Sequence, residues 1–179
     1  MNRGAASLTA FQELALVVLR TLVGWHFLYE GLSKLWPPAW GRAGLPLGRW
    51  TSAGYLRAAT GPFSDAFQGI ASSRLVAMLD VLMPIALLLV GASLMLGLFT
   101  RLGSLGALAL LALFYVSSIP TAGVHQAGAE GAYLIVNKNL VEAAAVLVLL
   151  GFDTGRIAGL DLLRRRRRDD RVGRQEVSS

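Results

Sequence analysis

Four ionisable side chains lie on one face of a long apolar segment near the start of the chain. At about 100° per residue in a helix, Arg20, His26, Glu30 and Lys34 fall within about a third of the helix circumference. A charge near the centre of a membrane-spanning helix costs roughly 2.5 to 3.5 kcal/mol. We therefore expect this face to contact other helices, a water-filled cavity or a polar ligand.

Two interpretations of this face remain open. Glu30 and Lys34 are four residues apart in the order that favours a helical ion pair, so the charges could pair with one another and with neighbouring helices. Ionisable residues inside a membrane also mark proton relays and ligand sites, and His26 can exchange protons near neutral pH.

The segment that carries these side chains, residues 10–36, is typical of a membrane-spanning helix that ends at Pro37 and Pro38. Further apolar runs predict three more spans, at residues 75–99, 102–119 and 132–152. We therefore expect an all-α membrane protein whose residues 10–153 form a four-transmembrane-helix bundle. A leader (residues 1–9) and a basic tail (residues 154–179) flank it. Residues 51–71 of the long first loop are too polar to span, so they are expected to be interfacial or re-entrant.

The composition supports a membrane protein and excludes several kinds of site. Of 179 residues, 54% are hydrophobic and none is cysteine, which excludes disulfides, thiolate metal sites and cysteine nucleophiles. The net charge of +6 does not indicate nucleic acid, because eight of the seventeen basic residues follow Asp153. Five of these form the run Arg164 to Arg168, which is typical of a contact with anionic lipid headgroups.

Arginine placement also predicts the orientation. The tail outweighs the other loops, so we expect an inner (cytoplasmic) membrane protein with both termini in the cytoplasm. The first loop argues against this orientation, because this topology would place its four arginines outside: Arg42, Arg49, Arg57 and Arg74.

In this topology, polar residues of three spans lie near the same side of the membrane, the outer one. They comprise Glu30 and Lys34 of the first span, Asp80 of the second, and Asn137, Lys138 and Glu142 of the fourth. An interhelical ion-pair network would satisfy them, and so would a pocket in which His26 or a carboxylate moves protons. His26 and His125 lie far apart in the sequence, so no metal or haem site is expected.

Four short motifs occur in order along the chain. The first expected helix carries the pattern Arg20-x3-Gly24-x2-Phe27-x3-Gly31-x2-Lys34. The others are Trp50-Thr-Ser-Ala-Gly-Tyr55, Leu96-Gly-Leu-Phe-Thr-Arg101 and Asn137-Lys-Asn-Leu-Val-Glu142. Together these motifs resemble those of the DoxX/DoxD-like membrane proteins.

The resemblance implies a four-helix membrane bundle. One branch of that family forms the large membrane subunit of a thiosulfate:quinone oxidoreductase, which passes electrons to quinone beside a second polypeptide. From it we expect a quinone-linked oxidoreductase subunit, with a diffusible quinone and a second protein subunit or larger complex as partners. Glu30, Asp80 and Glu142 are the candidate catalytic residues. The candidate quinone- or substrate-binding residues are Arg20, His26, Lys34, Asn137 and Lys138, and Arg42, Arg49 and Arg57 are the candidate anion-attracting residues of the loop.

Two other functions fit the same sequence. One is a non-catalytic assembly subunit of a respiratory or photosynthetic membrane complex. The other is a small transporter, since charges inside a membrane also mark ion paths.

Overall fold

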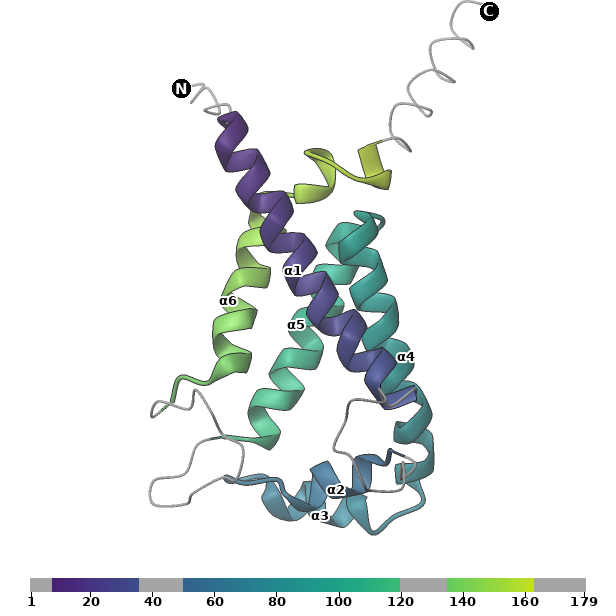
Figure 1. Cartoon of the computed structure of the whole chain (residues 1–179). Helices are drawn as coiled ribbons and strands as arrows, with labels where there is room; N and C mark the ends of the chain where they lie inside the picture. The colour runs from purple at the N-terminus through teal and green to yellow at the C-terminus, as the bar shows by residue number, and fades with distance from the viewer. Residues whose placement is uncertain (1–7, 36–49, 120–134, 163–179) are drawn as a thin grey trace, which may run out of the picture.

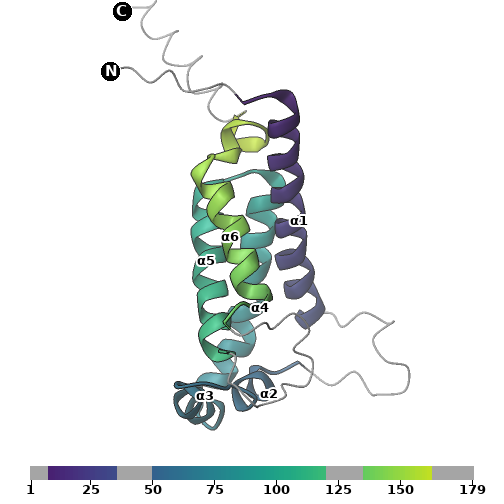
Figure 2. The ribbon, with the colours of Figure 1, turned by 90° about the vertical axis from the view of Figure 1, so that its left-hand side faces the viewer.

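The computed structural model describes residues 8–35, 50–119 and 135–162, and this part of the chain is helical. Four helices lie side by side: α1 (Ala10–Leu35), α4 (Leu75–Leu96), α5 (Thr100–Ser117) and α6 (Lys138–Gly151) (Figure 1, Figure 2). The shorter α2 (Ser52–Arg57) and α3 (Ser64–Ala71) lie across one end of them, and the turn η1 (Thr154–Arg156) lies at the other end.

The helices α1, α4 and α5 are each long and apolar enough to cross a membrane. Large apolar side chains on all three face outward, among them Leu22, Leu89 and Leu105. The chain is therefore a membrane protein whose outer helix faces suit a lipid bilayer, as the composition predicts. Inside, one core cluster draws residues from α1, α4, α5 and α6, with Leu94, Ala107 and Val146 fully buried.

The helix predicted over residues 132–152 begins later in the structure, at Lys138. Residues 135–137 precede α6, because Asn137 caps it: the Asn137 side chain accepts a hydrogen bond from the Leu140 amide at 3.1 Å. Residues 132–134 lie outside the described part of the chain. The 14 residues of α6 span about 21 Å, less than the hydrocarbon core of about 30 Å.

Glycines bring α1 and α4 into close contact. A Cβ atom on Gly91 of α4 would lie 2.7 Å from Leu28 Cα and 2.8 Å from the Gly24 carbonyl oxygen of α1. A Cβ atom on Gly31 of α1 would likewise lie 2.9 Å from the backbone nitrogen of Leu88 of α4. Small residues allow such close packing of helices in lipid, and the glycines of the first-helix pattern lie at this contact.

Replacing Gly91 by alanine is expected to destabilise the protein by about 1 to 3 kcal/mol, because the new methyl group meets backbone rather than flexible side chain. Gly151→Ala is the matched control, since no atom lies within 4 Å of its added Cβ. The measurement is the unfolding free energy in mild detergent for both variants. Equal stability of the two would contradict a tight α1–α4 contact.

The layer formed by α2 and α3 is held to the ends of α4 and α5. Asp80 of α4 accepts hydrogen bonds from the Ser52 amide and hydroxyl, each at 2.6 Å. The Tyr55 hydroxyl lies 2.7 Å from Ser117 Oγ of α5, and Ser117 in turn donates to a carbonyl, so Tyr55 donates. Burial raises the pKa of Tyr55, which keeps this donor protonated.

Candidate functional site

The contact most capable of chemistry joins α1 to α6. His26 Nδ1 lies 2.6 Å from Glu142 Oε1. The His26 side chain is 47% exposed, while that of Glu142 is 13% exposed. A carboxylate that accepts from one imidazole nitrogen orients the ring and leaves the other nitrogen available to a ligand.

A second ion pair lies further along α1. Lys34 Nζ is 2.5 Å from Glu30 Oε2, in the i,i+4 arrangement that the sequence predicts. The same ammonium lies 5.6 Å from the centroid of the Trp50 ring, just before α2. Lys34 is largely buried by these contacts, at 16% exposed, whereas Glu30 is 44% exposed.

Lys138, at the first position of α6, completes the group. It interacts electrostatically with both His26 and Glu30, and Glu30 also interacts with His26. We call these five side chains, His26, Glu30, Lys34, Lys138 and Glu142, the α1–α6 polar cluster. Its two carboxylates balance its two ammonium groups when His26 is neutral. The convergence was predicted for three spans: the structure brings together the charged residues of α1 and α6, while Asp80 of α4 contacts Ser52.

Asp80 connects α4 to the start of α2. Its carboxylate accepts from Ser52 at the start of α2, and Ser52 follows Trp50 by two residues. This contact links Asp80 to the short segment that also carries Trp50, whose ring lies beside Lys34. In the structure Asp80 positions α2, while its predicted role as a proton carrier stays a prediction.

We expect Asp80→Ala to loosen α2 without unfolding the spans. Two donors of Ser52 would lose their acceptor, at a cost of about 1 to 3 kcal/mol. Hydrogen exchange of the α2 amides should accelerate while that of α5 stays slow. Asp65→Ala, at an exposed position of α3, is the control and should leave α2 protection unchanged. Unaltered α2 exchange in Asp80→Ala would show that other contacts hold the helix.

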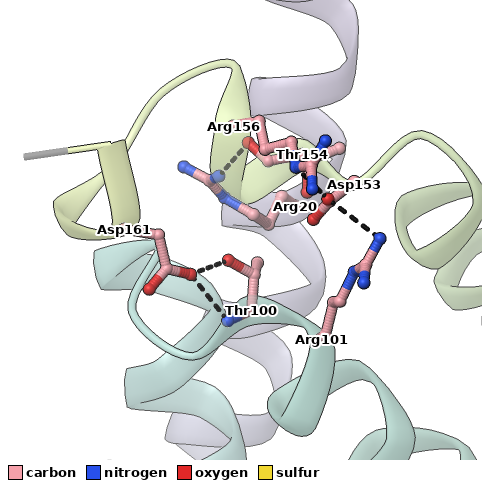
Figure 3. A network of polar contacts seen from close by, with 7 residues as sticks. All are labelled: Arg20, Thr100, Arg101, Asp153, Thr154, Arg156 and Asp161. Atoms are coloured by element: carbon pink, nitrogen blue, oxygen red, sulfur yellow. Dashed lines mark hydrogen bonds and ion pairs between the residues drawn. The ribbon is translucent and has the colours of Figure 1, made fainter. Parts of the chain in front are cut away.

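Arg20 does not join the polar cluster, which corrects the expectation drawn from the shared helix face. Arg20 is 3% exposed, and its side chain donates to the Thr154 carbonyl at 2.8 Å (Figure 3). It also donates to the Ala158 carbonyl at 2.6 Å. These carbonyls belong to the segment after α6, at the end of the helices opposite α2 and α3. The reason is depth: six residues separate Arg20 from His26, about 9 Å along a helix axis.

The other predicted residues divide between structure and surface. Asn137 is buried and caps α6, which gives it a structural role. Arg57 is exposed in the last turn of α2, whereas Arg42, Arg49 and His125 lie outside the described residues. Within the described ranges, no group of three or more histidine or acidic side chains is arranged to hold a metal ion.

Residues after α6 form a second polar network that the sequence reasoning missed. Asp161, Asp153 and Thr154 all contribute to it, although the sequence assigns two of them to the tail. The packed region thus extends to Leu162, past the domain boundary predicted at residue 153. The sequence feature that could have indicated this network is the presence of acidic residues within the basic region.

Comparisons of the chain with protein-family models, with curated proteins and with solved structures found no match.

Proposed function

We propose that this chain is the membrane subunit of a quinone-linked oxidoreductase of the DoxX/DoxD-like kind. The observation that carries the proposal is the His26–Glu142 pair, which combines a proton-exchanging ring with a carboxylate on a half-exposed site between two helices. In this proposal α6 completes a four-helix bundle as the fourth crossing. The protein then lies in the inner (cytoplasmic) membrane with both termini in the cytoplasm.

Quinone reduction needs two electrons and two protons at the carbonyl oxygens. His26 can donate a proton to one carbonyl and be reprotonated through Glu142, because a positioned imidazole and carboxylate act as a relay. Lys34 or Lys138 can stabilise the negative charge that develops on the reduced ring. A quinone reaching His26 from lipid would lie beside the exposed aromatic residues Trp25 and Tyr29, whose ring centroids are 6.1 Å apart.

The electrons would come from a sulfur oxyanion such as thiosulfate, oxidised on the outer side. Arg42, Arg49 and Arg57 are the residues of the first loop that would attract this anion. We expect a second protein subunit to take part in the oxidation.

The test is thiosulfate-dependent quinone reduction by the purified protein with its co-purifying partner. Glu30→Gln and Lys34→Met each break the 2.5 Å ion pair next to His26, and turnover should fall about tenfold or more. Glu13→Gln, in the first turn of α1, is the control and should keep wild-type turnover. Unchanged turnover in both cluster variants would remove these residues from the mechanism.

A second candidate function is a non-catalytic assembly subunit of a larger respiratory or photosynthetic complex. It is favoured by the pairing of the polar cluster, in which Glu30, Lys34 and Glu142 already have partners within the chain. Isolation from native membranes in mild detergent separates the two. Stoichiometric recovery within a large complex and without bound quinone would support assembly, and quinone retained by the chain and its small partner would support the oxidoreductase.

A further inference from the structure

The Lys34 ammonium is contacted from three directions. Its Nζ atom donates to Glu30 Oε2 at 2.5 Å and to the Glu30 carbonyl oxygen at 3.2 Å. The third contact is the ring of Trp50, whose centroid lies 5.6 Å from Nζ. An ammonium has three donors and no acceptor, so two oxygens and the negative face of an aromatic ring satisfy it.

The position of Lys34 along α1 makes this arrangement unusual. Lys34 lies in the last turn of α1, at the end of the helices where α2 lies (Figure 1). A lysine near the end of a span commonly extends its charged group to the aqueous interface. Lys34 is instead 16% exposed, whereas its ion-pair partner Glu30 is 44% exposed. The side chain is therefore folded back onto its own helix, and the Trp50 ring lies against it.

Trp50 is anchored by the start of α2. The next residue, Thr51, caps this helix, and its hydroxyl accepts a backbone hydrogen bond at 3.3 Å. Ser52 donates from both its amide and its hydroxyl to one oxygen of Asp80, Oδ1, each at 2.6 Å. The ring is thus two residues away from a double hydrogen bond to α4. A chain of contacts runs from Asp80 through Ser52 and Trp50 to Lys34.

This chain of contacts ends at the α1–α6 polar cluster. Lys34 pairs with Glu30, and Glu30 interacts electrostatically with His26 and Lys138. The position of the Lys34 ammonium therefore determines which charges surround the imidazole of His26. None of these contacts requires Asp80 to exchange a proton.

We propose that Trp50 is a positioning residue, which holds the Lys34 ammonium against Glu30, and that Asp80 fixes Trp50 through its bonds to Ser52. The consequence for quinone reduction rests on the proposed function: a held ammonium stabilises the charge on the reduced ring, because a preorganised charge needs no rearrangement during the reaction. The positioning itself does not depend on that function and can be measured without quinone.

Acylation of the lysines measures the positioning directly. The chain has two lysines, Lys34 and Lys138, and the exposed Lys138 is an internal reference. The full-length protein in mild detergent is treated with the N-hydroxysuccinimide ester of acetic acid, and the two acetylation rates are compared by peptide mass spectrometry. Trp50→Leu should raise the rate at Lys34 relative to Lys138 about fivefold, because an aromatic face favours a cation held against it by roughly that factor.

Two further substitutions separate the ring of Trp50 from a general loss of aromatic surface. Trp50→Phe keeps an aromatic face and should leave the ratio of the two rates within about twofold of wild type. Phe63→Leu is the matched control, because Phe63 is a 52% exposed aromatic residue just before α3. It should keep the wild-type ratio. A rise in Phe63→Leu equal to that in Trp50→Leu would overturn the specific role of Trp50.

Substitutions of Asp80 test the anchor. Asp80→Ala removes the acceptor of both Ser52 bonds and should raise the ratio as Trp50→Leu does. Asp80→Asn keeps an Oδ1 acceptor but exchanges no proton, and should keep the wild-type ratio. Both also serve as a second measurement if Trp50→Leu does not fold, which circular dichroism and a raised Lys138 rate would reveal. An unchanged ratio in Asp80→Ala, or an equal rise in Asp80→Asn, would overturn the anchoring role of the Ser52 bonds.

Turnover distinguishes this inference from the proposed function. Where quinone reduction is observed, Trp50→Leu should lower kcat about fivefold with little change in KM, and Trp50→Phe should retain most of it. Added to Lys34→Met, Trp50→Leu should cause no further loss, because Trp50 acts through Lys34. A raised Lys34 ratio in Trp50→Leu, with no quinone reduction by wild type, would support the positioning and contradict the proposed function. An unchanged Lys34 ratio in a folded Trp50→Leu variant would overturn the positioning, whatever the turnover.

Discussion

Glu142→Gln is expected to lower quinone reduction about a hundredfold, the lower end of what general acid–base groups contribute. Glutamine keeps an oxygen that can accept from His26 Nδ1, now 2.6 Å from the carboxylate, so the α1–α6 contact survives. Glutamine cannot take up or return a proton, so His26 can no longer be reprotonated through residue 142. The loss should appear in kcat rather than in the KM for quinone, because the binding surface is unchanged.

The matched measurement is His26→Gln, which removes the group that would contact the quinone. It should lose as much turnover as Glu142→Gln, and the double variant should lose little more, because residues that act as one unit are not additive. Additive losses would indicate that the two side chains act separately. Wild-type turnover in both variants, with reduced unfolding free energy, would assign the pair a structural role and favour the assembly function.

The long apolar segments of the sequence predicted α1, α4 and α5, because the insertion of a helix into lipid depends on the composition of the whole segment. The α1 expected at residues 10–36 is observed at Ala10–Leu35, and α4 begins at the predicted Leu75. Small residues allow close helix packing in lipid, and Gly91 of α4 lies against α1. Local chemistry was also predictable where both partners share a helix, as for Glu30 and Lys34.

Partners from distant segments were not predictable in the same way. Periodicity sets the angle of a side chain about the helix axis but not which distant segment meets it at that depth. Arg20 shares a face with His26, yet its acceptors are carbonyls 134 and 138 residues away in the sequence. Asp161 lies in a basic stretch typical of a solvated tail, and only its contact with the start of α5 reveals the cap. The Ser52 partner of Asp80 was not predictable either, because Ser52 lies in a loop of mixed composition.

Replacing Arg20 by methionine is expected to destabilise the protein by about 3 to 5 kcal/mol. Methionine fills much of the same volume, but the Thr154 and Ala158 carbonyls would lose a charged donor at a site where Arg20 is 3% exposed. Each hydrogen bond to a charged group contributes about 1.5 to 3 kcal/mol, and an acceptor left buried without one carries the cost of its desolvation. Arg20→Lys keeps the charge but lacks the planar fork, so it should lose roughly half as much.

Arg57→Met is the control, because Arg57 is exposed on α2 and the same substitution there should change stability by less than about 0.5 kcal/mol. The measurement is the unfolding free energy of the three variants in mild detergent, together with hydrogen exchange of residues 154–162. The amides of residues 154–162 should exchange faster in Arg20→Met, while the amides of the helix turns that carry the α1–α6 polar cluster retain their protection. If Arg20→Met instead matches Arg57→Met in stability and loses quinone binding, then Arg20 belongs with His26 as the helix face predicts, and the carbonyl contacts do not hold residues 154–162 against α1.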